Sequence, residues 1–200
     1  MPREKRIWYP GAAYHLMSRG IRRSAICKDQ EDFEMFCMVI KHVMEKTPFK
    51  LHSFCMMTNH LHMQVTTLDT EIWKIMNRLL SNYAKNFNRR YGYTGHLFES
   101  RYTACLIENP VYFLEVSRYI HLNPVRAGMV REAMDYPYSS YSYYVSKRPH
   151  PLLEKKEILS YFSADPAEQY RIFVEGALSH EENEILIQKD IGEDENWLPW

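Results

Sequence analysis

Apolar and polar side chains alternate along residues 59–65, Asn-His-Leu-His-Met-Gln-Val, and this alternation predicts a β-strand. Successive side chains of a strand point to opposite faces of its sheet. His60, His62 and Gln64 are therefore expected on one face, while the apolar residues between and after them face a core. A metal and a substrate could reach the two imidazoles on the face away from that core.

The same periodicities predict three further strands and three helices. The strands are expected over residues 11–20, 49–57 and 102–107, and the helices over residues 30–46, about 69–90 and 111–122. Asp29 and Asn109 are suited to cap the first and third helices, and Asn123 with Pro124 predicts a turn after the third. The order strand, helix, strand, strand, helix, strand, helix favours an antiparallel sheet with helices packed against it, an α+β sandwich.

The C-terminal quarter shows weaker patterns. Residues 136–144 are rich in tyrosine and serine, which suits either the stacking of nucleobases or an aromatic wrap over the core. Two short helices are expected near residues 154–162 and 166–178, followed by a frayed acidic end at residues 191–200.

Composition indicates one compact domain, because 200 residues with 46% hydrophobic and 14% aromatic content can bury a core and carry a small appendage. No apolar run approaches the ~20 residues of a membrane-spanning helix, and no apolar segment follows the basic N-terminus as in a signal peptide. A cytoplasmic protein without a membrane partner is expected. The four cysteines form no Cys-x-x-Cys pair, which favours buried thiols over a zinc ribbon or a redox dithiol.

The formal net charge is zero, but the charges are unevenly distributed along the chain. Residues 1–151 contain 21 Lys and Arg against 13 Asp and Glu, a surplus of 8, whereas residues 152–200 contain 4 against 12, a deficit of 8. A basic body can supply the positive field that binds a polyanion, although ordinary solvated surface is the alternative. The candidate phosphate-binding residues are Arg19, Arg22, Arg23, Arg78, Lys85, Arg89, Arg90, Arg101, Arg118 and Arg126.

The third predicted helix carries a second chemical pattern. Tyr119 and Asn123 are four residues apart, so a helix places a phenol and an amide oxygen about one turn apart on one face. A phenol with an ordinary pKa near ~10 is a poor nucleophile at neutral pH and needs a metal or a cationic neighbour. His60 and His62 could hold a divalent ion to which Asn123 adds an oxygen. Taken alone, however, a His-x-His pair is often polar surface, and a tyrosine is often a packed aromatic.

Three stretches of the chain carry a family resemblance. They are Pro-Gly-x-x-Tyr-His-x-x-x-Arg-Gly at residues 10–20, Met-Thr-Asn-His-Leu-His at residues 57–62, and Arg-Tyr-Ile-His-Leu-Asn-Pro-Val-Arg-Ala-Gly at residues 118–128. Together they resemble the IS200-like single-tyrosine HUH transposases, and among these the REP-associated tyrosine transposases. The match runs in order across about residues 1–145, which makes it far more specific than any one motif. Thr58 stands where the family usually has proline, and Ile21 where asparagine is common.

The resemblance implies a ferredoxin-like antiparallel sheet with helices on its faces, the HUH endonuclease fold, over residues 1–145. Residues 146–200 would then form a helical extension with an acidic tail. It further implies a transposase that nicks and rejoins single-stranded DNA bearing a hairpin, such as a REP-like element, as a monomer or homodimer. Tyr119 would attack the DNA backbone and form a 5′-phosphotyrosine, with Mg²⁺ or Mn²⁺ held by His60, His62 and Asn123.

Two other functions compete with this one. A domesticated, non-catalytic protein that binds single-stranded nucleic acid would show salt-dependent binding without metal-dependent cleavage. The presence of His60, His62 and Tyr119 argues against it. An unrelated metal-dependent hydrolase would activate a water and leave no tyrosyl adduct, but no acidic cluster beside the histidines supports that reading.

Overall fold

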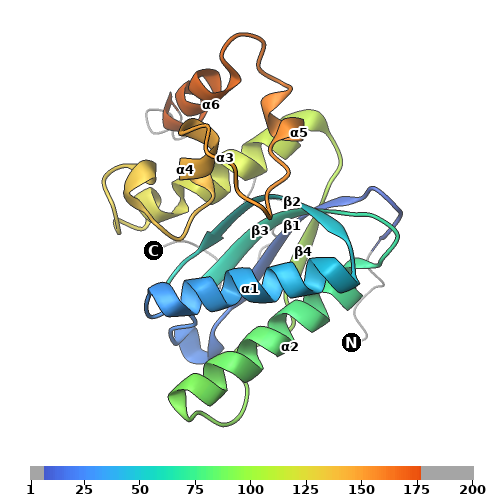
Figure 1. Cartoon of the computed structure of the whole chain (residues 1–200), viewed down its shortest axis with the longest axis vertical. Helices are drawn as coiled ribbons and strands as arrows, with labels where there is room; N and C mark the ends of the chain where they lie inside the picture. The colour runs from blue at the N-terminus through green and yellow to red at the C-terminus, as the bar shows by residue number, and fades with distance from the viewer. Residues whose placement is uncertain (1–6, 177–200) are drawn as a thin grey trace.

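A four-stranded antiparallel sheet lies at the centre of the computed structural model, which describes residues 7–176 (Figure 1). The strands are β1 (Ala13–Arg19), β2 (Phe49–Met56), β3 (His60–Thr67) and β4 (Thr103–Ile107). They lie in the order β2-β3-β1-β4, so that each helix joining two strands crosses over the strand between them. This ferredoxin-like arrangement confirms the α+β prediction.

Two helices cover one face of the sheet. α1 (Gln30–Lys46) begins at Asp29, whose side chain accepts a hydrogen bond from the backbone nitrogen of Asp32, and ends before Pro48 as predicted. α2 (Ile72–Tyr91) begins about two residues later than expected. The apolar sides of both helices pack on the apolar residues of β3, so the alternation along that strand is confirmed.

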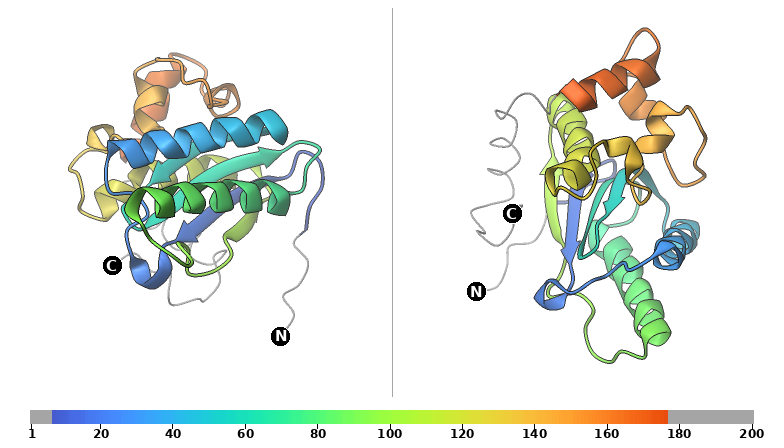
Figure 2. Two further views of the ribbon diagram at one scale, coloured as in Figure 1. Left: turned by 60° about the horizontal axis from the view of Figure 1, so that its bottom comes forward. Right: turned by 90° about the vertical axis from the view of Figure 1, so that its left-hand side faces the viewer.

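The opposite face of the sheet lies under α3 (Pro110–Arg126), and Figure 2 shows α3 on one side of the sheet and α1 and α2 on the other. This is the face that carries His60 and His62, on which the strand alternation predicts imidazoles that a metal and a substrate could reach. Instead His62 is only 2% exposed. The reason is that neighbouring strands also present apolar residues here, among them Cys55 and Ile107, and α3 buries them in a second core.

α3 is longer than predicted, because it continues through Asn123 and Pro124 where a turn was expected. Proline removes one helical hydrogen bond, but this one lies near the end of the helix, where Ala127 N donates to Asn123 O and closes the final turn. Leu122 and Pro124 are both buried. We attribute the continuation to this packing, which outweighs the local preference of the residue before proline.

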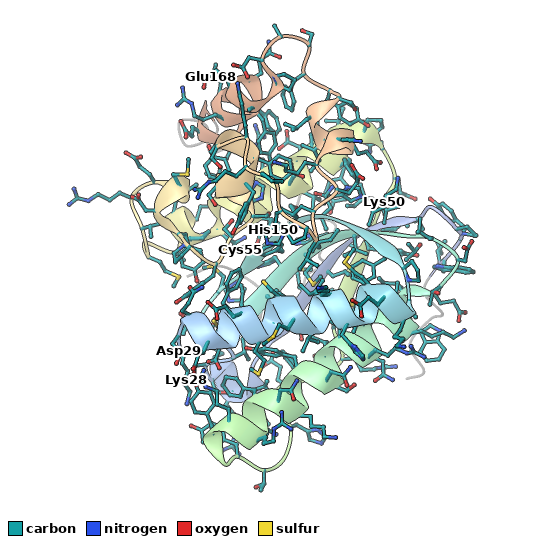
Figure 3. The ribbon with its side chains drawn as sticks, viewed as in Figure 1. Lys28, Asp29, Lys50, Cys55, His150 and Glu168 are labelled. Carbon is teal, nitrogen blue, oxygen red and sulfur yellow. The ribbon has the colours of Figure 1, made fainter. Side chains whose placement is uncertain are left out.

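Beyond α3 the chain folds back over the edge of β2 through η2 (Ala133–Asp135), α4 (Tyr141–Val145), α5 (Lys156–Leu159) and α6 (Pro166–Glu175). Ser140 N donates to Phe54 O and Glu154 N donates to Leu51 O, so the returning chain occupies backbone groups of this edge strand. Figure 3 marks the junction with Cys55 of β2 and His150, whose ring centroid lies 6.0 Å from that of Phe54.

The tyrosine-rich segment is an aromatic wrap. Tyr136, Tyr141 and Tyr144 are buried, and the hydroxyls of Tyr136 and Tyr144 donate to backbone oxygens of β2. α5 is shorter than predicted, and α6 begins at residue 166 as predicted. The predicted end of that helix at residue 178 and the expected acidic end at residues 191–200 lie outside the described residues. Every helix within residues 7–176 is too short or too polar to cross a bilayer.

Candidate active site

Gln64 ties the histidine strand to α3. Its Nε2 donates to the backbone oxygen of Phe113 at 2.8 Å, and its Oε1 accepts from Ser53 Oγ at 3.0 Å. Because buried polar groups are almost always partnered, this side chain fixes how the first turns of α3 lie on the sheet. The third helix therefore packs directly beside β3, which local sequence patterns alone could not establish.

The four residues proposed from the sequence lie together within one chain. The ring centroids of His60 and His62 are 5.0 Å apart, and those of His62 and Tyr119 are 5.5 Å apart. Asn123 lies one turn beyond Tyr119, and its Nδ2 donates to the backbone oxygen of Tyr119 at 3.2 Å. Its side chain also reaches His60. His60 and Tyr119 are half-buried, whereas His62 and Asn123 are buried.

Burial keeps both histidines neutral. Removal from water lowers the pKa of His60 to about 4, Arg19 lowers it further, and a hydrogen bond to the Asn123 side chain opposes the shift. The pKa of His62 lies well below its ordinary value, first because of burial and then because of the neighbouring His60, His15 and Arg19. A neutral imidazole retains the lone pair that binds a metal, so both rings are competent ligands at neutral pH.

The Nδ1 atoms of the two histidines are both engaged by protein groups. His60 Nδ1 lies 2.7 Å from Asn59 Oδ1, and His62 Nδ1 lies 3.1 Å from His15 Nε2. Metal-binding histidines usually have their second nitrogen held in this way, since the partner fixes the tautomer and the ring orientation. His15 belongs to the first family motif, but the sequence pattern assigns it no role.

The donor set fits a divalent ion. Among residues 7–176, no three His, Cys, Asp or Glu side chains are grouped so that they could hold a metal by themselves. A site here would thus combine the two imidazoles of His60 and His62 with an oxygen, and the amide of Asn123 lies in the right place to supply it. Amide oxygens suit Mg²⁺ and Mn²⁺, which also accept oxygens of a substrate phosphate.

A cation also lies beside the candidate nucleophile. The guanidinium carbon of Arg126, in the last turn of α3, is 5.6 Å from the centroid of the Tyr119 ring. On the other side of the site, Arg19 pairs with His60 in the register of β1 and β3, so its side chain is on the same face of the sheet.

The candidate phosphate-binding residues fall into separate groups. Arg19, Arg22 and Arg23 lie at or just after the end of β1, where Gly20 N donates to Asn59 O and holds this segment against the histidine strand. Glu99 N donates to Arg19 O, so the loop that leads to Arg101 lies next to them. With Arg126, these residues form the site-side basic group: Arg19, Arg22, Arg23, Arg101 and Arg126. Arg78, Lys85 and Arg89 are exposed on α2, on the other face of the sheet.

Arg90 and Arg118, which are among the ten candidates, form ion pairs within the protein, and their contact with DNA stays a prediction. Arg90 pairs with Asp29, Glu31 and Asp32 at the start of α1, and Figure 3 marks this place with Lys28 and Asp29. Arg118 is 9% exposed, pairs with Glu115, and lies over the ring of Phe173. Arg90 thus links α2 to the start of α1, and Arg118 links α3 to α6. These partners are distant in sequence, so local patterns do not identify them.

The aromatic loop after α2 is also partly occupied. Lys28 Nζ lies 3.9 Å from the ring centroid of Tyr91 and 4.8 Å from that of Tyr93, and it donates to the Tyr93 hydroxyl. Tyr91 is half-buried while Tyr93 remains 52% exposed. Stacking of bases on this loop stays a prediction.

Comparisons with known proteins match this chain to transposases. The family described as "Transposase IS200 like" matches residues 9–123, which is more than half of the chain and includes His60, His62, Tyr119 and Asn123. The structure of a REP-associated tyrosine transposase bound to a REP hairpin superposes with a TM-score of 0.64 and 21% identity, covering 76% of this chain and 90% of that one. No curated protein matches the sequence.

A second solved structure is more distant. It is a protein of Deinococcus radiodurans described as a candidate transposase, with a TM-score of 0.43 and 16% identity, over 59% of this chain and 95% of that one. The fold, the order of the motifs and the extent of the family match agree. The chain belongs to the IS200-like transposase family.

Proposed function

We propose that this protein is a metal-dependent endonuclease and strand transferase that nicks and rejoins single-stranded DNA bearing a hairpin. The observation that carries the proposal is the convergence of Tyr119 with His60, His62 and Asn123 within one chain, at ring distances of 5.0 and 5.5 Å. Family membership supports a transposase. The proposal adds that Tyr119 is the nucleophile, that a divalent metal is required, and that the substrate is single-stranded DNA with a hairpin.

Tyr119 is the nucleophile in this proposal. Its phenolic oxygen forms a bond to a backbone phosphorus while the bond from that phosphorus to the 3′ oxygen breaks. The phenol proton passes to solvent and the departing 3′ oxygen takes up a proton, so the products are a 5′-phosphotyrosine and a 3′-hydroxyl. Rejoining is the reverse reaction, in which a 3′-hydroxyl attacks the phosphotyrosine and releases Tyr119.

The surrounding side chains prepare this step. His60, His62 and Asn123 would hold Mg²⁺ or Mn²⁺, which when bound supplies positive charge that polarises the scissile phosphate. Arg126 beside the Tyr119 ring would supply a second positive charge close to the attacked phosphate. The edge-to-face packing of Tyr119 on His62 keeps the nucleophile close to the ligands.

Hairpin DNA is the proposed substrate because the similar REP-associated transposase was solved with a REP hairpin bound. The site-side basic group would contact phosphates near the cleaved bond. A monomeric or homodimeric state, a cytoplasmic location and the division of the chain at residue 145 stay predictions.

A strand-cleavage assay tests the proposal. Hairpin oligonucleotides with randomised flanks, labelled at either the 5′ or the 3′ end, are incubated with the protein and Mn²⁺ and separated on denaturing gels. The 3′ label is expected to remain on the protein, because the tyrosine retains the fragment whose 5′ end carries the phosphate. Tyr119→Phe should abolish the adduct, and Tyr161→Phe, which changes an exposed tyrosine, should retain it.

An undiminished adduct in Tyr119→Phe would overturn the assignment of the nucleophile. Binding of the hairpin pool with no adduct under any metal condition would instead favour the non-catalytic alternative. Cleavage that leaves neither label on the protein would favour a hydrolase that activates water.

A further inference from the structure

His15 lies on β1, on the same face of the sheet as the candidate ligands of β3. In the antiparallel register His15 is opposite Gln64 and Met17 is opposite His62, so His15 and His62 are diagonal neighbours. Their rings are stacked with centroids 5.3 Å apart and an angle of 25° between the planes. His15 Nε2 lies 3.1 Å from His62 Nδ1, which is hydrogen-bonding distance.

A hydrogen bond between His15 Nε2 and His62 Nδ1 requires one hydrogen between these two nitrogens. Both are buried, at 0% and 2% exposure, and a buried imidazole is more stable as the neutral ring. Between two neutral imidazoles only one of the facing nitrogens carries the hydrogen. If His15 donates, the hydrogen of His62 must lie on Nε2, which then has no lone pair for a metal. If His62 donates from Nδ1, its Nε2 lone pair is available.

The partner of His60 shows which ring nitrogen carries the hydrogen when the other nitrogen is free to bind a metal. His60 Nδ1 lies 2.7 Å from Asn59 Oδ1, and an amide oxygen can only accept, so His60 carries its hydrogen on Nδ1 and keeps its lone pair on Nε2. His62 has the same nitrogen engaged, but by an imidazole in place of an oxygen. The two candidate ligands are thus contacted at the same ring atom, Nδ1, one by an amide oxygen and the other by an imidazole nitrogen.

Within residues 7–176, the contact with His62 is the one side-chain hydrogen bond recorded for His15. Its Nδ1 is buried without a hydrogen-bond partner among the described residues. An apolar side chain at this position would avoid that unpaired atom, since buried polar groups without partners are destabilising. The ring also packs edge-to-face on Tyr119, with centroids 5.6 Å apart. His15 therefore contacts both a candidate ligand and the candidate nucleophile.

We propose that His15 is a positioning residue that accepts the Nδ1 hydrogen of His62 and so keeps the Nε2 lone pair of His62 available for the metal. This inference rests on the proposed function, because it takes His62 as a metal ligand. No proton is gained or lost; only the location of one hydrogen is set. The neighbouring contact with Tyr119 places the nucleophile against the same pair of rings.

The tautomer can be observed directly in the metal-free protein. Long-range ¹H–¹⁵N spectra of uniformly ¹⁵N-labelled protein distinguish a hydrogen on Nδ1 from one on Nε2 of each histidine. His62 is expected to carry its hydrogen on Nδ1 in the full chain at pH 7. A hydrogen on His62 Nε2 would overturn the proposal without any substitution being made.

Two substitutions at position 15 then test the consequence. His15→Leu removes the acceptor, and His15→Gln retains an amide oxygen near the position of Nε2. Mn²⁺ affinity, measured by calorimetry without DNA, should fall about 10- to 100-fold in His15→Leu, as for other residues that orient metal ligands, and by much less in His15→Gln. Equal losses in both variants, with unfolding curves that show both are folded, would overturn the proposal.

These measurements separate this inference from the proposed function. The spectrum and the Mn²⁺ titration require no DNA cleavage, so both can be measured whether or not a tyrosyl adduct forms. If His62 has the expected tautomer and His15→Leu loses Mn²⁺ affinity but no tyrosyl adduct forms on DNA, then the proposed function fails while the role of His15 holds. If the adduct forms and His62 has the opposite tautomer, then only the role of His15 fails.

Discussion

Histidines buried as neutral rings make the stability of the molecule depend on pH. His121 on α3 is fully buried, its Nδ1 lies 2.7 Å from the hydroxyl of Tyr170, and its Nε2 lies 2.7 Å from Ser140 Oγ. Burial lowers the pKa of His121 to about 3 from an ordinary value of 6.5. The folded state therefore resists protonation that the unfolded state accepts, and stability is full above pH 6.5 and declines as the pH falls toward 3.

Urea unfolding in the absence of metal should reveal this dependence. Between pH 7.5 and pH 5, His121 alone is expected to lower the free energy of unfolding by about 2 kcal/mol, since each pH unit below 6.5 costs about 1.4 kcal/mol. In His121→Gln the difference between the two pH values should shrink by about that amount. His42→Gln, which changes an exposed histidine, gives the matched control. An unchanged pH difference in His121→Gln would show that this ring is not kept neutral.

Gly20 is required by close contact between backbone segments. A Cβ added there would lie 2.1 Å from the backbone oxygen of Ser24, which no packing tolerates. The turn that it would displace carries Arg22 and Arg23, both in the left-handed region with φ of 51° and 59°. Gly20 thus allows the chain to turn sharply next to the histidine strand.

Gly20→Ala is expected to destabilise the protein by about 1–3 kcal/mol, as other overpacked sites do, and to weaken hairpin binding by moving the two arginines. Chemical denaturation and gel-shift assays measure the two effects. Gly176→Ala is the control, because no atom of residues 7–176 is found within 4 Å of its added Cβ and its φ is −61°. Equal stabilities of the two variants would contradict the close approach at Gly20.

At the scale of elements, α3 is held from both sides. Gln64 bonds its first turns to the sheet, and Tyr170 of α6 bonds its outer side by donating to Ser117 Oγ at 3.1 Å and contacting His121. Asn109 caps its start, as the sequence predicts, by accepting from Tyr112 N. The position of Tyr119 over the histidines is therefore set by contacts along the whole helix.

Tyr170→Phe should lower the free energy of unfolding by about 1–3 kcal/mol, because it leaves His121 Nδ1 and Ser117 without their buried partner. Thermal or urea unfolding measures the loss. Tyr161→Phe removes the same hydroxyl from a side chain that is 47% exposed and should cost little. If both variants lose the same stability, the buried network is not what attaches α6 to α3.

At the scale of the whole molecule, basic side chains lie on both faces of the sheet, but only one face carries the candidate active site. The site-side basic group includes Arg22 and Arg23, while Arg78 and Arg89 are on α2 across the sheet. If DNA is cleaved at Tyr119 as proposed, the strand lies on the face of the sheet next to the site-side basic group. The arginines of α2 are on the opposite face. Phosphate contacts are expected where the scissile bond is held.

Two double variants separate these groups. Arg22→Gln with Arg23→Gln should weaken hairpin binding and reduce the slope of log affinity against log salt by about 0.7 for each phosphate that is no longer neutralised. Arg78→Gln with Arg89→Gln should change binding far less. Fluorescence anisotropy at several salt concentrations, in a Tyr119→Phe background that prevents cleavage, measures both. A larger loss of affinity in the α2 variant would place the DNA on the other face of the sheet.

The sequence by itself determined the order of the elements, the two faces of β3, the cap of α3 and the residues of the candidate site. These follow from local rules, because side-chain direction repeats every two residues in a strand and every 3.6 in a helix. The pair of histidines and the spacing of Tyr119 and Asn123 were visible for the same reason. The order of motifs added the family, which the comparison over residues 9–123 confirms.

Only the tertiary structure decided which surfaces these elements cover. The burial of His62 under α3, the continuation of α3 through Pro124, and the pairing of Arg90 with the start of α1 all depend on residues distant in sequence. So does the contact of His15 with His62, which are 47 positions apart and become neighbours through the register of β1 and β3. Local periodicity fixes the direction of a side chain, whereas its partner depends on how the elements pack.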